Sequence, residues 1–243
     1  IHMKILGLSI ICWLTMVGAV SANGTLPDLI QVGDREGALE MIDAGADVNG
    51  AQGDGTTPLH WAVYKADVEL IRLLLERGAK PDAMNNYGSS PLAEAAKVGN
   101  AQLVEILLDA GADVESANQE GQTALMLAAR AGSMNVAEVL AGRGADVNAR
   151  EAWRGQTALM WATVEGNTGA ALALLSGGAA LDARSTGGFT PLLFAVRHNH
   201  QETLRALVEA GADVDDRLPG GMSALALATL NANYDLGVWL LGQ

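Results

Sequence analysis

Two hydrophobic segments alternate along most of the chain, and the pair recurs about every thirty-three residues. The first segment is short and opens on Thr or Ser, then Pro or Ala, then Leu. The second is longer and places Leu and Val at helical spacing, as Val104, Leu107 and Leu108 do. This pattern predicts a pair of amphipathic helices in every unit, a short helix followed by a longer one.

Local signals set the ends of the short helix. Thr or Ser is a favourable N-cap, and in three units a proline follows at the first helical position, where a missing N–H costs nothing. The helix is expected to end at a glycine such as Gly99, because glycine adopts the left-handed conformation that closes a helix. Ala66 and Ala232 replace this glycine in two units, where we therefore expect local strain.

Two landmarks keep the period in register. The fragment Thr-Pro-Leu-His at residues 57–60 has counterparts that begin at residues 90, 123, 157, 190 and 223. Gly-Ala-Asp, or a variant of it, begins at residues 45, 78, 111, 144, 178 and 211. One period before Thr57 lies Gly24, so the chain is predicted to hold about seven units, of which the first is degenerate.

A single unit is not expected to fold alone. It offers about five or six buried aliphatic side chains at roughly 1.5–3 kcal/mol each, whereas ordering its backbone costs about 1–2 kcal/mol per residue. Neighbouring units must therefore share one continuous hydrophobic core, which predicts an elongated stack.

Motifs of the form Thr-Pro-Leu-His-x-Ala and Leu-Leu-x-x-Gly-Ala-Asp-Val-Asn, at a period of 33 residues, resemble the ankyrin repeat over residues 24–243. The resemblance implies an all-α fold, an ankyrin-repeat solenoid of stacked helix pairs with protruding β-hairpin-like loops. The domain is assigned to residues 23–243, with its first and last units as caps. The resemblance also implies a scaffold that binds other proteins through its concave helix face and loop tips, without chemistry, cofactor or small-molecule substrate.

The last unit departs from the pattern expected of a cap. Its second helix, which includes Tyr234 and Trp239, carries little charge, whereas a terminal repeat usually needs a polar outer face. Either another chain covers that end or the chain has been cut short.

Composition agrees with a thin helical stack. Hydrophobic residues make up 49% of the chain but aromatic residues only 4%, so Ala, Leu and Val dominate. The formal net charge of −13 argues against nonspecific nucleic-acid binding and against docking on anionic lipid, since both need Lys and Arg. The one cysteine, Cys12, lies near the N-terminus, so the remainder has no disulfide or thiolate metal site.

The first twenty-two residues predict a vector remnant and a secretory signal peptide. Residues 1–2 precede Met3, Lys4 supplies a basic start, and residues 5–20 include no charge. Small side chains at the positions that signal peptidase reads predict cleavage after Ala22. The mature protein is then expected to be periplasmic or secreted.

Two alternatives concern the same segment. A lipoprotein needs small residues just before its cysteine, and the two isoleucines before Cys12 disfavour it. Uncleaved, residues 5–20 approach the length that spans a bilayer and would tether the protein as a structural or protective accessory.

Helical geometry predicts which side chains of the first helices meet a partner. The Leu of each Thr-Pro-Leu motif and the residues three and four later face inward together, so the residues two, five and six beyond it are expected to face out. In chain order they are Trp61, Tyr64, Lys65; Glu94, Lys97, Val98; Leu127, Arg130, Ala131; Trp161, Val164, Glu165; Phe194, Arg197, His198; and Leu227, Leu230, Asn231.

Aromatic and cationic members of this face, together with loop-tip residues, are the predicted partner contacts, because both residue types are typical of binding hot spots. They are Trp61, Tyr64, Lys65, Tyr87, Lys97, Arg130, Trp153, Arg154, Trp161, Phe189, Phe194, Arg197 and His198. The pair at 153–154 lies in the loop with an extra residue, which makes it a candidate anchor. Alternatively, Trp61, Trp161 and Phe194 fill the seam between first helices, and Trp153 folds back onto the stack.

No catalytic or metal site is expected. The serines lack a nucleophile elbow, and the family resemblance makes His60 a structural residue bonded to backbone and Thr. His198 and His200 straddle the break between two helices, with no third ligand nearby in sequence.

Overall fold

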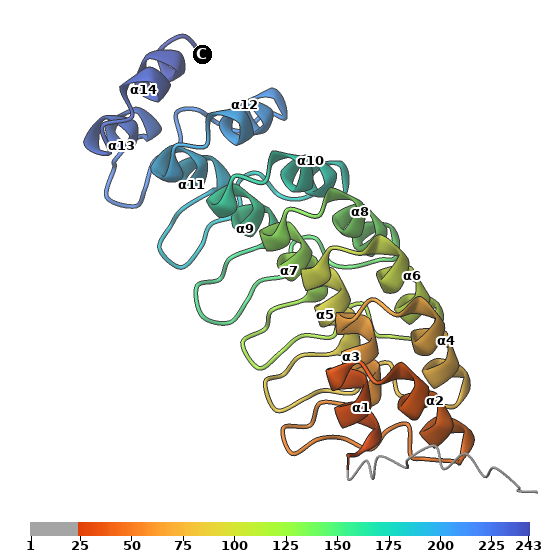
Figure 1. The fold of residues 1–243 in the computed structure, drawn as a ribbon. Helices are drawn as coiled ribbons and strands as arrows, with labels where there is room; N and C mark the ends of the chain where they lie inside the picture. The colour runs from red at the N-terminus through yellow and green to blue at the C-terminus, as the bar shows by residue number, and fades with distance from the viewer. Residues whose placement is uncertain (1–23) are drawn as a thin grey trace, which may run out of the picture.

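The computed structural model describes residues 24–243, which form seven consecutive helix pairs. The first helices of the pairs make an inner row and the second helices an outer row, and both rows follow one curved stack (Figure 1). The inner helices are α1 (Leu26–Val32), α3 (Pro58–Tyr64), α5 (Pro91–Val98), α7 (Ala124–Ala131), α9 (Ala158–Glu165), α11 (Pro191–His198) and α13 (Ala224–Leu230). The outer helices are α2 (Arg35–Asp43), α4 (Val68–Glu76), α6 (Ala101–Asp109), α8 (Met134–Gly142), α10 (Thr168–Ser176), α12 (Gln201–Glu209) and α14 (Tyr234–Leu240).

Long loops connect each outer helix to the next inner helix and project on the concave side of the stack (Figure 1). Over residues 24–243 they contain no extended strand. Two isolated antiparallel bridges, Ala117 to Thr123 and Arg217 to Ser223, give two of them a hairpin shape. The predicted all-α solenoid with hairpin-like loops is confirmed.

The inner helices begin where the motif predicts, with one shift. In six of them the Thr or Ser side chain accepts a hydrogen bond from the backbone N–H three residues later. In the first unit the N-cap is Thr25. The preceding residue, Gly24, lies one period before the cap Thr57, but it has no side chain that could accept a capping hydrogen bond. The Asp28 carboxylate accepts hydrogen bonds there from the Thr25 N–H (2.8 Å) and hydroxyl (2.7 Å).

The closing positions of the inner helices are left-handed, as predicted. Gly99 has φ +76°, and Asn199 takes the same place with φ +60°. Ala66 and Ala232 are also left-handed, at φ +54° and +59°, although their Cβ atoms disfavour this region. The expected strain at both alanines is thus present in the backbone.

The substitution Ala66→Gly is expected to raise the free energy of unfolding by about 1 kcal/mol, because glycine adopts the left-handed conformation without a Cβ penalty. Urea denaturation followed by circular dichroism measures it. Gly99→Ala is the opposite control and should be destabilising, because its new Cβ would lie 2.4 Å from the Ser133 Oγ. An unchanged or lower midpoint for Ala66→Gly would contradict the assignment of strain.

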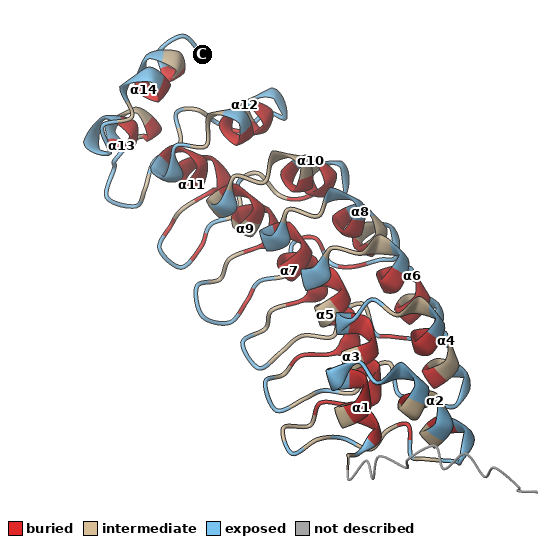
Figure 2. Cartoon of the chain, in the orientation of Figure 1, coloured by how far each residue is buried: buried red, intermediate tan, exposed pale blue. Residues whose placement is uncertain are grey.

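The hydrophobic core runs the length of the stack between the two rows of helices (Figure 2). Leucines such as Leu59 and Leu107 are fully buried, and alanines such as Ala128 let adjacent inner helices lie close together. Among the buried hydrophobic side chains of residues 24–243, Phe194 is the one aromatic. The thin, aromatic-poor core expected from composition is therefore observed.

Arginines at the loop bases tie neighbouring loops together. Arg184 Nη1 donates to the carbonyl of Gly188 in its own loop (2.9 Å) and to that of Arg217 in the next unit (3.1 Å). Its second amino group pairs with Asp216. Arg150, one unit earlier, likewise donates to its own loop and to the carbonyl of Arg184. These contacts fix the base from which each loop tip projects.

The last unit leaves an apolar face exposed. Leu230, Tyr234, Val238 and Leu241 are each largely accessible, whereas Leu236 and Leu240 pack inward. The polar outer face usual for a terminal repeat is therefore not found on α14.

Candidate protein-binding surface

The inner helices and loop tips together form a surface on the concave side. Of the predicted contacts, Lys65, Lys97, Arg130, Arg154, Arg197 and His198 are exposed, as are Tyr64, Tyr87 and Trp153. Trp153 is 75% accessible, so the alternative in which it folds back onto the stack is wrong. Trp61, Trp161 and Phe189 are half-buried.

For three residues, each two positions beyond the Leu of its motif, the predicted outward orientation is wrong. Phe194, two residues beyond its Leu, is only 6% exposed, and Leu127 and Leu227 in the same position are also buried. Neighbouring inner helices flank this position and cover it, which a single-helix projection does not include. Phe194 therefore fills the seam between inner helices and stacks on Phe189, with ring centres 5.0 Å apart.

The central part of the surface holds a groove of about 370 Å³, which we call the Trp153 groove. Arg154 lies over the Trp153 ring (5.0 Å) in the loop, while Arg130 lies over the Trp161 ring (5.7 Å) on the helices. Within residues 24–243 the buried Nε1–H of Trp161 has no hydrogen-bond partner. Two aromatic rings and two guanidinium groups thus line one concave site.

Glu151 organises the loop that carries Trp153, and sequence reasoning missed it. The Glu151 side chain is buried, and its carboxylate accepts hydrogen bonds from the backbone N–H of Trp153 (2.7 Å), Arg154 (2.8 Å) and Gln156 (2.9 Å). Asn118, one unit earlier, accepts two such bonds in its own loop. Glu151 aligns with Asn118, and its longer side chain spans a loop that has one more residue. The role of Glu151 could have been recognised in the sequence from this alignment.

A second groove of about 320 Å³ lies near the N-terminal end, and we call it the Trp61 groove. The rings of Trp61 and Tyr64 meet edge to face, with centres 5.8 Å apart and planes at 90°. Tyr87, on the next loop, is 74% exposed. The carboxylates of Asp54 and Glu94 complete the lining.

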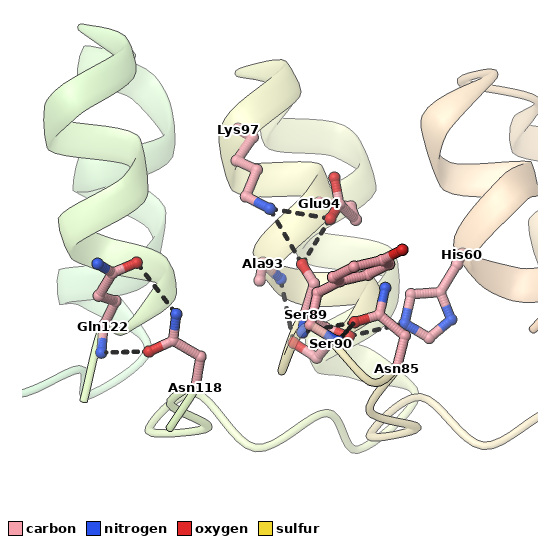
Figure 3. A network of polar contacts seen from close by, with 10 residues as sticks. His60, Asn85, Ser89, Ser90, Ala93, Glu94, Lys97, Asn118 and Gln122 are labelled. Carbon is pink, nitrogen blue, oxygen red and sulfur yellow. Dashed lines mark hydrogen bonds and ion pairs between the residues drawn. The ribbon is translucent and has the colours of Figure 1, made fainter. Parts of the chain in front are cut away.

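A polar network joins α5 to the loop before it (Figure 3). Lys97 Nζ donates to Glu94 Oε1 (2.9 Å) and to Ser89 Oγ (3.1 Å), and the Ser89 hydroxyl donates to Glu94. The Lys97 amino group is engaged by the Glu94 carboxylate as well as by Ser89, so the three side chains tie the helix to the loop. The arrangement favours a structural role for Ser89.

His60 bridges two units, in agreement with its predicted structural role. Its Nδ1 lies 2.8 Å from the Thr57 hydroxyl oxygen, and its Nε2 lies 2.9 Å from the carbonyl oxygen of Ser89. Figure 3 shows the ring beside Ser89. His60 is buried. Burial lowers the pKa of His60 below its ordinary value, because it disfavours the charged form.

This lowered pKa predicts a pH dependence of stability. The unfolded chain takes up a proton near the ordinary value of 6.5, whereas folded His60 resists it. Stability should therefore be full above that pH and fall progressively as the pH drops toward the lower folded value. Urea unfolding at about pH 7.5 and about pH 5.5 should show a smaller acid loss in His60→Gln than in the parent. Equal losses in both proteins would contradict the prediction.

The histidines at the end of α11 lie side by side, with one ring nitrogen engaged by the backbone. The rings of His198 and His200 stack with centres 6.1 Å apart, but His200 Nε2 is engaged with the Val164 carbonyl oxygen (3.0 Å). No group of three potential ligands from His, Cys, Asp and Glu is found within residues 24–243.

Charge is divided unequally between the two helix rows. The outer helices hold eleven Asp and Glu against three Lys and Arg, whereas the inner helices hold three of each. The outer helix row, which lies away from the concave surface, is therefore the more acidic of the two rows.

Comparison with known families agrees with this architecture. A family model described as "Ankyrin repeats (3 copies)" matches the overlapping stretches 28–118, 82–151, 115–185, 143–218 and 173–243. The chain belongs to the ankyrin repeat family. Ankyrin repeats generally mediate protein–protein interaction and are typically non-catalytic. No curated protein matches the sequence.

Two predictions for this ankyrin repeat protein concern residues that the structure does not describe. The signal peptide and its alternative as a membrane anchor fall on residues 1–22, outside the described residues. Among the helices of residues 24–243, none is long and apolar enough to cross a membrane.

Proposed function

We propose that this ankyrin repeat protein is an exported, non-catalytic scaffold that binds another protein through its concave surface and loop tips. The observation that carries the proposal is the Trp153 groove. Its exposed Trp153 and Arg154 stand on a loop that the buried Glu151 holds in place. A held loop loses little conformational entropy on binding, so its aromatic and cationic side chains are suited to anchor a partner.

Site-specific photocrosslinking tests this docking site. A photoreactive phenylalanine analogue at position 153 should yield one discrete adduct with a protein from the secreted or periplasmic fraction. The same analogue at Tyr234, an exposed aromatic residue outside the groove, is the matched control. Adducts from position 234 and none from position 153 would place binding elsewhere.

Affinity for the crosslinked partner gives the second measurement. The double variant Trp153→Ala/Arg154→Ala should weaken binding by about thirtyfold or more, as loss of hot-spot residues does. Tyr234→Ala should bind like the parent. If the double variant also keeps the parent's dissociation constant, the Trp153 groove is not the docking site.

Export is the second part of the proposal and is supported by the uncharged run at residues 5–20 before Ala22. Mass spectrometry of the exported protein should give a mature N-terminus at Asn23. A membrane-bound product that keeps the first twenty-two residues would instead support the alternative, a tethered structural or protective accessory.

A further inference from the structure

Two tryptophans hold the same position in α3 and α9, three units apart, yet their rings have different neighbours. The ring of Trp161 is faced by Arg130 of the preceding unit, 5.7 Å from its centre. Other aromatic rings of this half of the stack are also faced by arginines of the chain itself. They are Trp153, faced by Arg154, and Phe189, faced by Arg197.

Within residues 24–243, no cation of the chain lies over the ring of Trp61. The residue that corresponds to Arg130 in the unit before Trp61 is Gln31, which is neutral and accepts a hydrogen bond from Gln52 (2.8 Å). Within residues 24–243, the nearest comparable contact in this groove is Lys65, whose Nζ lies over Tyr64 at 6.0 Å and not over Trp61. The Trp61 groove therefore has an aromatic wall without an arginine of its own.

The Trp61 ring is held in position before any ligand arrives. Its Nε1–H donates to Gln52 Oε1 (2.8 Å), and Gln52 Nε2 in turn donates to Asp28 Oδ1 (2.6 Å). Tyr64 meets Trp61 at a right angle, which makes a corner of two aromatic faces. A fixed corner of this kind costs little entropy on binding.

Negative charge lies beside the aromatic corner. The Asp54 carboxylate accepts a hydrogen bond from the Thr56 N–H (2.9 Å), which lowers the pKa of Asp54 below its ordinary value. Within residues 24–243 Asp54 makes no ion pair, whereas Glu94 on the other wall is paired with Lys97. The groove thus combines aromatic faces with one unpaired carboxylate.

We propose that the Trp61 groove receives an arginine side chain of the partner polypeptide, which lies in the corner between Trp61 and Tyr64, stacked on Trp61 and paired with Asp54. This inference rests on the proposed function and names the chemistry that a partner must present. Arginine is the best fit because its planar guanidinium stacks on aromatic rings and donates to carboxylates at the same time. The chain's own Arg130, stacked on Trp161 and beside Glu165 (3.7 Å), is an internal example of the same arrangement.

Titration with a defined peptide tests the inference. The blocked peptide Gly-Gly-Arg-Gly-Gly is added to the nitrogen-15-labelled protein, and the tryptophan indole N–H signals are followed by NMR, with Trp61→Phe to assign the signal. The Trp61 signal should shift saturably, and Asp54→Asn should weaken binding about tenfold. The same peptide with citrulline, which keeps the shape but not the charge, should give no shift.

A reciprocal exchange provides the sharper control. Gln31→Arg should place a cation over Trp61, as Arg130 lies over Trp161, and should abolish the peptide-induced shift. Arg130→Gln should make the Trp161 signal respond to the same peptide. Equal shifts from the citrulline peptide, or an undiminished shift in Gln31→Arg, would overturn the proposal.

The two proposals fail separately. If the arginine peptide leaves Trp61 unmoved while partner capture still depends on Trp153, the inference is wrong and the scaffold function stands. If the peptide binds at Trp61 but the Trp153 variants capture partner normally, the arginine site stands and the Trp153 groove is not the anchor.

Discussion

Replacing Leu107 with alanine is expected to lower the free energy of unfolding by about 2–5 kcal/mol. Leu107 is fully buried in α6, the outer helix of the third unit, which packs against α5 of its own unit and α8 of the next. The substitution removes three carbon atoms from a core that has few large side chains to close the cavity. Urea denaturation followed by circular dichroism measures the loss.

The matched control for this change is Leu241→Ala. Leu241 is largely exposed after α14, so its replacement should alter the free energy of unfolding by no more than about 0.5 kcal/mol. A similar small effect for Leu107→Ala would mean that α6 does not contribute to a continuous core.

Replacing Glu151 with alanine is expected to lower the free energy of unfolding by about 1.5–3 kcal/mol. The Glu151 carboxylate accepts the backbone N–H groups of Trp153, Arg154 and Gln156, and water replaces these bonds only in part. Amide hydrogen exchange at these three residues should accelerate in Glu151→Ala, while amides in α12 stay protected. Binding of the partner should also weaken, because the loop that carries Trp153 and Arg154 is then less firmly held.

Two variants separate the length of the Glu151 side chain from its charge. Glu151→Gln keeps the length and one acceptor oxygen, so it should retain part of the protection. Glu151→Asn introduces the residue found at position 118 but is too short for a loop with an extra residue. Wild-type exchange rates in Glu151→Ala would show that the carboxylate does not hold this loop.

Periodic landmarks predicted much of the fold because ankyrin units contact mainly their neighbours. The caps at Thr57 and Ser90 and the closing residue Gly99 depend on backbone geometry within one turn, which the local sequence contains. The first helix is capped by Thr25 and not by Gly24, the residue one period before Thr57. The period did not predict this shift because the degenerate first unit lacks the Thr-Pro-Leu motif from which the register was counted.

The candidate surface was predicted less completely. Exposure of Tyr64 and Arg130 follows from their position on a single helix, and both are exposed. Phe194 was assigned to the same face, but the helices on either side of α11 bury it. The role of Glu151 could have been inferred from its alignment with Asn118 and from the extra loop residue.

The sequence alone determined the repeat, the helix pairs and the side chains available to the concave surface, because these depend on local geometry and on a period that recurs. Only the tertiary structure decided which aromatic rings are covered by an arginine of the same chain. Trp161 is covered by Arg130 and Trp61 is not, although both occupy the same place in their units. That difference arises from contacts between neighbouring units, where residues about thirty positions apart in the chain meet.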